Sequence, residues 1–138
     1  MSSWIIDEAF HTDANAEILR FIRQANPSAH SDVADELTRA GAGTPGVRPY
    51  CPDYARYAFV ALHLQDLTIV GIAFGTSGLA FRLPESRVAE ALEDGGVIAV
   101  EIGLRWIRFA PWTDHETLAQ SRRRLSRWCA VSASRSAA

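Results

Sequence analysis

Apolar residues recur at helical spacing in the first third of the chain. Over residues 13–25 the sequence ANAEILRFIRQA places isoleucine and leucine three and four positions apart, before Pro27. This pattern predicts a first helix. A shorter repeat over 31–41, with Ser31 as the expected N-cap and glycines at its end, predicts a second helix.

The pattern then changes to one of strands. Residues 43–56, GTPGVRPYCPDYAR, show neither a helical nor a strand period, and their prolines and glycines predict a loop. Alternating apolar residues follow, separated by the turn signals QD and GTSG. They predict three consecutive antiparallel strands over 57–65, 68–74 and 79–83.

After Pro84 the chain returns to helical spacing over 85–94, and GG ends the predicted helix. A fourth strand is predicted from the alternation Ile98, Val100, Ile102, Leu104. Continued further, the alternation buries Trp106 with Arg108 and turns Ile107 outward. This conflict predicts either a bulge near Arg105 and Trp106 or a strand that begins only there.

The last predicted helix covers residues 114–131. Thr113 and Glu116 match the capping-box pattern, in which each side chain binds the other residue's backbone NH. Trp112, directly before this box, is expected to pack against the helix as a hydrophobic staple. The polar tail 132–138 is expected to be flexible.

These elements predict a single α+β domain over residues 1–138. The expected architecture is a single-layer antiparallel sheet of about four strands with flanking helices, in the order ααβββαβα.

Charge and cysteine content narrow the function classes. The formal net charge is −2, which argues against a domain that binds nucleic acid over its whole surface. All 14 basic side chains are arginine; codon usage in a GC-rich genome is a simpler reason than anion binding. Two distant cysteines and no apolar run long enough for a membrane span indicate a cytoplasmic protein without membrane contact.

The search for chemistry yields no metal site, no cofactor site and no catalytic set. The four histidines are scattered, and no zinc-ligand spacing occurs. Cys51 is the one candidate nucleophile, with His63 or His115 as a hypothetical base, and a small enzyme that uses Cys51 remains an alternative.

Arginines concentrate in two places. Four lie on the last helix as a possible anion or nucleic-acid stripe: Arg122, Arg123, Arg124 and Arg127. The alternative is a solvated helix face that favours the negative C-terminal end. The second concentration lies in GLRWIRFAPW, together with Arg82 in the strand predicted over 79–83. It supplies the candidate binding residues Arg82, Arg105, Trp106, Arg108 and Trp112. Trp106 is either an exposed anchor between arginines or a core residue, and burial is the favoured interpretation.

The last 80 residues resemble the small α+β proteins of the TfoX N-terminal domain and YjbR (MmcQ) type. The resemblance rests on Phe81 to Pro84, Val88 to Leu92, Gly103 to Phe109 and the helix from Thr113 onward. It implies a curved antiparallel sheet with flanking helices, roles in DNA binding or protein contacts, and no established catalytic residues. The acidic net charge and the lack of lysine depart from this family.

Together these observations predict a non-catalytic binding module that recognises a protein or a small molecule on its sheet face. It is expected to act as a monomer or homodimer. Nucleic-acid binding, as an accessory domain in transcription regulation, is the alternative with the weaker support.

Overall fold

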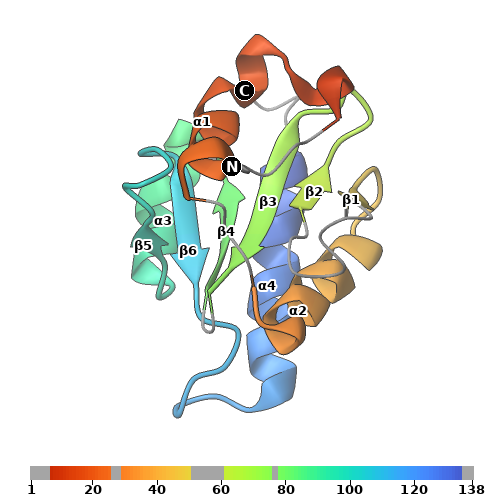
Figure 1. Cartoon of the computed structure of the whole chain (residues 1–138). Coiled ribbons are helices and arrows are strands. Elements are labelled where there is room, and N and C mark those ends of the chain that lie inside the picture. The colour runs from red at the N-terminus through yellow and green to blue at the C-terminus, as the bar shows by residue number, and fades with distance from the viewer. Residues whose placement is uncertain (1–6, 26–28, 51–60, 76–77, 135–138) are drawn as a thin grey trace.

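The computed structural model describes residues 7–25, 29–50, 61–75 and 78–134 of the chain. It is an α+β structure with one open antiparallel sheet and helices on both of its faces (Figure 1). The α-helices are α1 (Ala16–Ala25), α2 (Ser31–Ala42), α3 (Val88–Glu93) and α4 (Leu118–Ala133). The strands are β1 (Arg48–Tyr50), β2 (Ala61–His63), β3 (Ile69–Phe74), β4 (Gly78–Arg82), β5 (Val97–Ile98) and β6 (Trp106–Phe109).

The sheet has the strand order β1-β2-β3-β4-β6-β5, and every neighbouring pair is antiparallel. The first four strands therefore follow one another as a meander. After β4 the chain passes through α3 to the far edge and returns as β6, which pairs with β4 over Arg82↔Trp106 to Leu79↔Phe109. This return places β6 in the interior of the sheet, where it has neighbours on both sides.

One face of the sheet packs against α2 and α4. Figure 1 shows α4 passing behind the strands. The core on this side joins Leu37 of α2 and Trp128 of α4 to Phe81, Ile107 and Phe109 of the sheet, all at most 1% exposed. The ring of Phe109 stacks on that of Trp128 at 6.0 Å. Alternation along β6 sends its odd-numbered side chains to this face.

The opposite face is covered by α1 and by the segment that links β5 to β6. Ile18 and Ile22 of α1 and Ile102 of the link pack with Ile72 and Trp106 of the sheet. The two core clusters lie on opposite faces, so the sheet is the middle of three layers. The chain therefore does not form a sheet that is covered on one face and open for binding on the other.

A buried asparagine attaches the N-terminal segment to the sheet. Asn15 is fully buried; its Nδ2 donates to the carbonyls of Phe10, at 2.8 Å, and Leu67, at 2.9 Å. Its Oδ1 accepts from the amide of Ile69 at 2.8 Å. Leu67 has a φ of 69°, a left-handed conformation that is uncommon outside glycine. Asn15 thus satisfies backbone groups on both sides of a tight turn between β2 and β3.

The sheet has six strands, which corrects the expected number of about four. The segment predicted to be a loop over 43–56 contains β1, which pairs with β2 in the register Arg48↔His63 to Tyr50↔Ala61. The rest of that prediction, 51–56, lies outside the described residues, as do the first residues of the strand expected over 57–65.

The fourth predicted strand is divided in two. Only Val97 and Ile98 form β5; the chain then turns, and the new strand β6 begins at Trp106. Val100 and Leu104, expected to face the core, are 73% and 71% exposed. Of the two alternatives for Arg105 and Trp106, a strand that begins there is therefore confirmed. Alternation failed because the apolar residues of 99–104 belong to a turn.

The start of the last helix also differs from the prediction. The capping box is formed by Thr117 and Gln120, and α4 begins at Leu118. Thr113 and Glu116 instead bind each other through their side chains. Trp112 lies five residues before the true N-cap and is 43% exposed, so it is not a hydrophobic staple.

Two smaller expectations are corrected as well. His30, not Ser31, caps α2 by accepting the amide of Asp32 on Nδ1. Helix α4 reaches Ala133, and Ser132 is buried, so the beginning of the tail expected to be flexible is helical. In the part of the chain that the structure describes, no helix is both long and apolar enough to cross a membrane.

Candidate functional site

Trp106 lies in the core, at 1% exposure. It heads β6 on the face that α1 covers, and its backbone carbonyl accepts from Ala99 at 2.8 Å. The favoured interpretation of Trp106 as a core residue is thus confirmed. An indole buried in this way gives shape to the molecule but does not contact a ligand.

Two of the predicted arginines stand beside Trp106 where β4 and β6 meet. Arg82 is the register partner of Trp106 and is half-buried. Arg105 donates from Nε to the carbonyl of Leu83 at 2.9 Å, while the Leu83 amide donates to the Arg105 carbonyl at 2.8 Å. Arg105 therefore extends the strand pairing by one step, and its guanidinium is partly used for that purpose.

Arg108 is the predicted residue that faces open space. It lies two positions after Trp106 on β6, hence on the same face of the sheet. Its side chain is 39% exposed and donates from one terminal nitrogen to Glu101 at 3.5 Å. A pair this long and this exposed contributes little free energy, so the guanidinium is available to a ligand.

Around Arg108 the ends of four strands leave a groove of 530 Å³, the sheet-end groove. Its lining residues are Phe74, Gly75, Gly78, Gly95, Val97, Arg108 and Ala110. The ring of Phe74 closes one end because it packs edge-on against Phe21 of α1 at 5.7 Å. A volume of this size is within the range typical of small-molecule sites.

Gly78 leaves room for the side chain of Arg108, which lies directly against it. A Cβ added at Gly78 lies 2.9 Å from Cδ of Arg108, so a side chain there displaces the arginine stem. The sequence analysis identified the GTSG stretch only as a turn, and Thr76 and Ser77 lie outside the described residues. Gly75 and Gly78 were missed because nothing local links them to Arg108, some 30 positions later.

Three of the four arginines of the predicted stripe on α4 are engaged within the protein. Arg122 binds both carboxylate oxygens of Glu36, at 3.1 and 2.9 Å. Arg124 and Arg127 also form ion pairs with acidic side chains. Arg123 is exposed, and no ion pair of Arg123 occurs with any described residue. A uniform cationic stripe is therefore not present on this helix.

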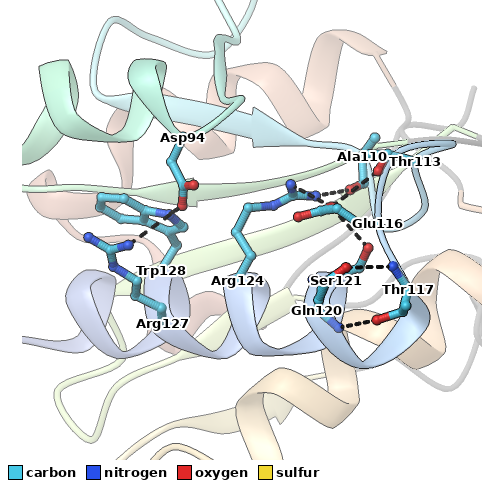
Figure 2. A network of polar contacts seen from close by, with 10 residues as sticks. All are labelled: Asp94, Ala110, Thr113, Glu116, Thr117, Gln120, Ser121, Arg124, Arg127 and Trp128. Carbon is cyan, nitrogen blue, oxygen red and sulfur yellow. Dashed lines mark hydrogen bonds and ion pairs between the residues drawn. The ribbon is translucent and has the colours of Figure 1, made fainter.

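Glu116 fastens the segment before α4 onto the helix (Figure 2). Its Oε1 accepts from the hydroxyls of Thr113 and Ser121, both at 3.1 Å, and pairs with Arg124 at 2.7 Å. Arg124 also donates to the Ala110 carbonyl at 3.2 Å. The Nε of Arg124 is buried and has no hydrogen-bond partner among the described residues. The arginine is held in place by its terminal nitrogens alone.

A second cluster joins α3 to α4 around Trp128. The indole nitrogen donates to Asp94 at 2.7 Å, and the guanidinium of Arg127 lies over the ring, 5.0 Å from its centre. Arg127 also pairs with Glu90 and, at 3.8 Å, with Asp94. The hydrogen bond from Arg87 and the charge of Arg127 hold the pKa of Glu90 below its usual range, against a partial loss of hydration. This cluster is a structural clamp between two helices.

A cleft lies between these two clusters, along one side of α4. This α4 cleft has a volume of 340 Å³ and is lined by Asp94, His115, Glu116, Gln120, Arg123, Arg124 and Arg127. Asp94 lines the cleft while its neighbour Gly95 lines the sheet-end groove. Three of the four predicted stripe residues therefore line a recess together with acidic residues and a histidine that sequence reasoning did not connect with them.

The ion pair of Glu36 and Arg122 leads to a prediction about stability. Glu36 is only 6% exposed whereas Arg122 is 36% exposed, and the hydrogen bond to Glu36 raises the pKa of Arg122. We expect Arg122→Gln to lower Tm by several degrees, because it leaves a buried carboxylate without its cation. Glu36→Gln is expected to lower Tm less, since Arg122 still reaches water and an amide oxygen. Equal losses, or the reverse order, in thermal unfolding by circular dichroism would contradict this.

Of the residues considered for nucleophilic chemistry, Cys51 lies outside the described residues. Cys129 is buried, and desolvation raises the pKa of its thiol although a hydrogen bond with Thr44 opposes this. His63 is bound through Nδ1 to the Leu64 carbonyl at 2.8 Å, and the ring of Phe10 meets it edge-on at 5.0 Å. His115 lies in the α4 cleft, on a different part of the molecule from β2.

Within the described ranges, no group of three or more histidine, cysteine or acidic side chains is placed to hold a metal ion. Comparison with known proteins identified no matching family model, curated protein or solved structure. The resemblance to the TfoX and YjbR type therefore stays a prediction, and the function must be argued from the two recesses themselves.

Proposed function

We propose that this protein is a non-catalytic binding module whose sheet-end groove takes a small molecule with a carboxylate and an apolar body. The observation that carries the proposal is the position of Arg108, whose guanidinium lies in a groove of 530 Å³ and, among the described residues, forms an ion pair only with Glu101, one that is long and exposed. A guanidinium binds a carboxylate through two parallel hydrogen bonds.

The rest of the groove suits the body of such a ligand. Phe74, Val97 and Ala110 offer apolar contacts, and Val97 is 53% exposed in the absence of a ligand. Gly75 and Gly95 keep the walls low, so that a flat ligand approaches the backbone closely. The described lining contains no nucleophile, carboxylate or imidazole, which supports recognition over acid–base or covalent catalysis.

Benzoate is a suitable probe because it joins a carboxylate to a flat apolar ring. We expect its titration to shift the backbone amide resonances of the residues that line the groove, whereas benzamide, which has the same shape without the charge, binds weakly. Arg108→Gln is expected to weaken benzoate binding about 10- to 100-fold, the effect typical of losing hydrogen bonds to a charged group. The measurement is the dissociation constant from amide shifts.

Two further variants test the geometry. Glu101→Gln removes the internal competitor for Arg108 and is expected to tighten benzoate binding a few-fold. Gly78→Ala displaces the side chain of Arg108 and is expected to weaken benzoate binding. Arg23→Gln, on the exposed side of α1, is the matched control and leaves affinity unchanged. The proposal fails if benzoate leaves the groove resonances in place, or if the Arg23 and Arg108 variants bind equally.

A further inference from the structure

The α4 cleft differs from the sheet-end groove in its lining, because every side chain around it is polar or charged. More of its lining surface is polar than apolar. This favours recognition of a polar group. The cleft is formed on one side by α4 and on the other by the segment that Glu116 and Arg124 fasten to the helix, so its shape is fixed without a ligand (Figure 2).

Most charges in and beside the cleft cancel in pairs. Glu116 pairs with Arg124, and Arg127 with Asp94. Glu90 forms ion pairs with both Arg127 and Arg87. Three carboxylates thus face three arginines, and the positive charge of Arg123 is left over among the described residues that surround the cleft.

The hydrogen-bond donors of the cleft come from two sides. Arg123 and Arg127 are four residues apart on α4 and so lie on the same side of the helix. His115 lines the cleft from the segment before α4. The uncompensated charge of Arg123, with further donors beside it in a mostly polar recess, suits an anion with several oxygens.

We infer that the α4 cleft is a binding site for a small phosphate-bearing molecule, with Arg123 as its principal contact and His115 and Arg127 beside it. A phosphate group has three terminal oxygens and can accept hydrogen bonds from both sides of the cleft at once. The cleft volume of 340 Å³ leaves room for the phosphate and a small group attached to it. The inference is independent of the function proposed for the sheet-end groove.

The test is a titration of the full chain with inorganic phosphate at low ionic strength, followed by amide chemical shifts. Sodium chloride at the same ionic strength is the control for general salt effects. We expect phosphate alone to shift the amides of His115, Gln120 and Arg123. Arg123→Gln, an exposed position on α4, is expected to raise the dissociation constant about tenfold or more. Arg20→Gln, an equally exposed arginine on α1, is the matched control and leaves it unchanged.

Further arms distinguish a phosphate site at Arg123 from binding elsewhere on the protein and from binding of nucleic acid. Arg108→Gln must leave phosphate binding unchanged, because Arg108 lines the sheet-end groove and not the α4 cleft. The two proposed binding sites are thereby tested separately. A phosphate monoester that binds more tightly than inorganic phosphate supports a small organic phosphate as the ligand. The inference is overturned if chloride produces the same shifts, if the Arg20 and Arg123 variants respond alike, or if a short DNA duplex binds at Arg123 and the small phosphates do not.

Discussion

Trp106→Ala is expected to lower the free energy of unfolding by about 3–5 kcal/mol, the cost of deleting a large buried aromatic side chain. The indole is 1% exposed and packs with Ile18 and Ile22 of α1 and with Ile102. Ala99 and Ile102 of the link between β5 and β6 belong to the same buried cluster, so the deletion leaves a cavity inside the core. Urea unfolding monitored by far-ultraviolet circular dichroism gives the measurement.

Trp112→Ala is the matched control, because it deletes the same side chain six residues later where the indole is 43% exposed. Its effect is expected to stay within about 0.5 kcal/mol of zero, as for most surface substitutions. If Trp106→Ala does not fold, Trp106→Phe retains most of the packing and is expected to show a smaller loss. Equal destabilisation by the two alanine variants would show that Trp106 is not a core residue.

Asn15→Ala is expected to destabilise the protein by about 2–4 kcal/mol, although it removes a small side chain. The carboxamide is the hydrogen-bond partner of the carbonyls of Phe10 and Leu67 and of the amide of Ile69. Because the site is fully buried, water does not replace these bonds when the side chain is lost. The same denaturant titration measures the loss.

Asn15→Asp separates the hydrogen bonds from the packing, since its shape is almost the same. The new carboxylate faces two carbonyl oxygens in a buried site, so its pKa in the folded state is raised above the value in the unfolded chain. The native state then binds the proton more tightly, and the variant is expected to gain stability relative to the original protein as the pH falls from about 7 to about 4. Gln24→Ala, an exposed carboxamide on α1, is the control. A pH-independent difference would contradict the role assigned to Asn15.

Sequence patterns predicted those elements that carry a regular apolar pattern along their own length. The helices α1, α2 and α3 bury one face, and the strands β3 and β4 contribute alternate residues to the cores on the two faces of the sheet. Of the two edge strands, β1 was missed, and β5 was predicted only as the beginning of a longer strand. Two of the three residues of β1 are exposed, Pro49 among them, and β5 has only two residues. Such strands are defined by the neighbour with which they pair, and a local pattern does not contain that information.

The start of α4 shows why a correct motif still led to the wrong residue. The sequence contains two overlapping candidates, Thr113 with Glu116 and Thr117 with Gln120. Only the second forms the capping box, because Glu116 is engaged with Arg124, two turns into the helix. An ion pair made possible by packing thus decided between two locally equivalent helix starts.

The candidate site was predictable in part. Arg108 and the arginines of α4 were identified as candidates because guanidinium groups concentrated there. Their partners were not, since Glu36 meets Arg122 from 86 residues away. Whether an arginine is free for a ligand or used within the protein depends on such distant neighbours. Among the arginines of α4 and β6, Arg123 and Arg108 are the ones available to a ligand.

The edges of the sheet have a consequence for the behaviour of the chain at high concentration. One edge is the three-residue strand β1 with a proline at its centre, and the other is the two-residue strand β5. Proline offers no NH group, and neither strand presents a row of backbone groups long enough to template a strand from another molecule. In the part of the chain that the structure describes, the sheet edges therefore disfavour edge-to-edge aggregation, and contacts of these edges with other molecules are made through side chains.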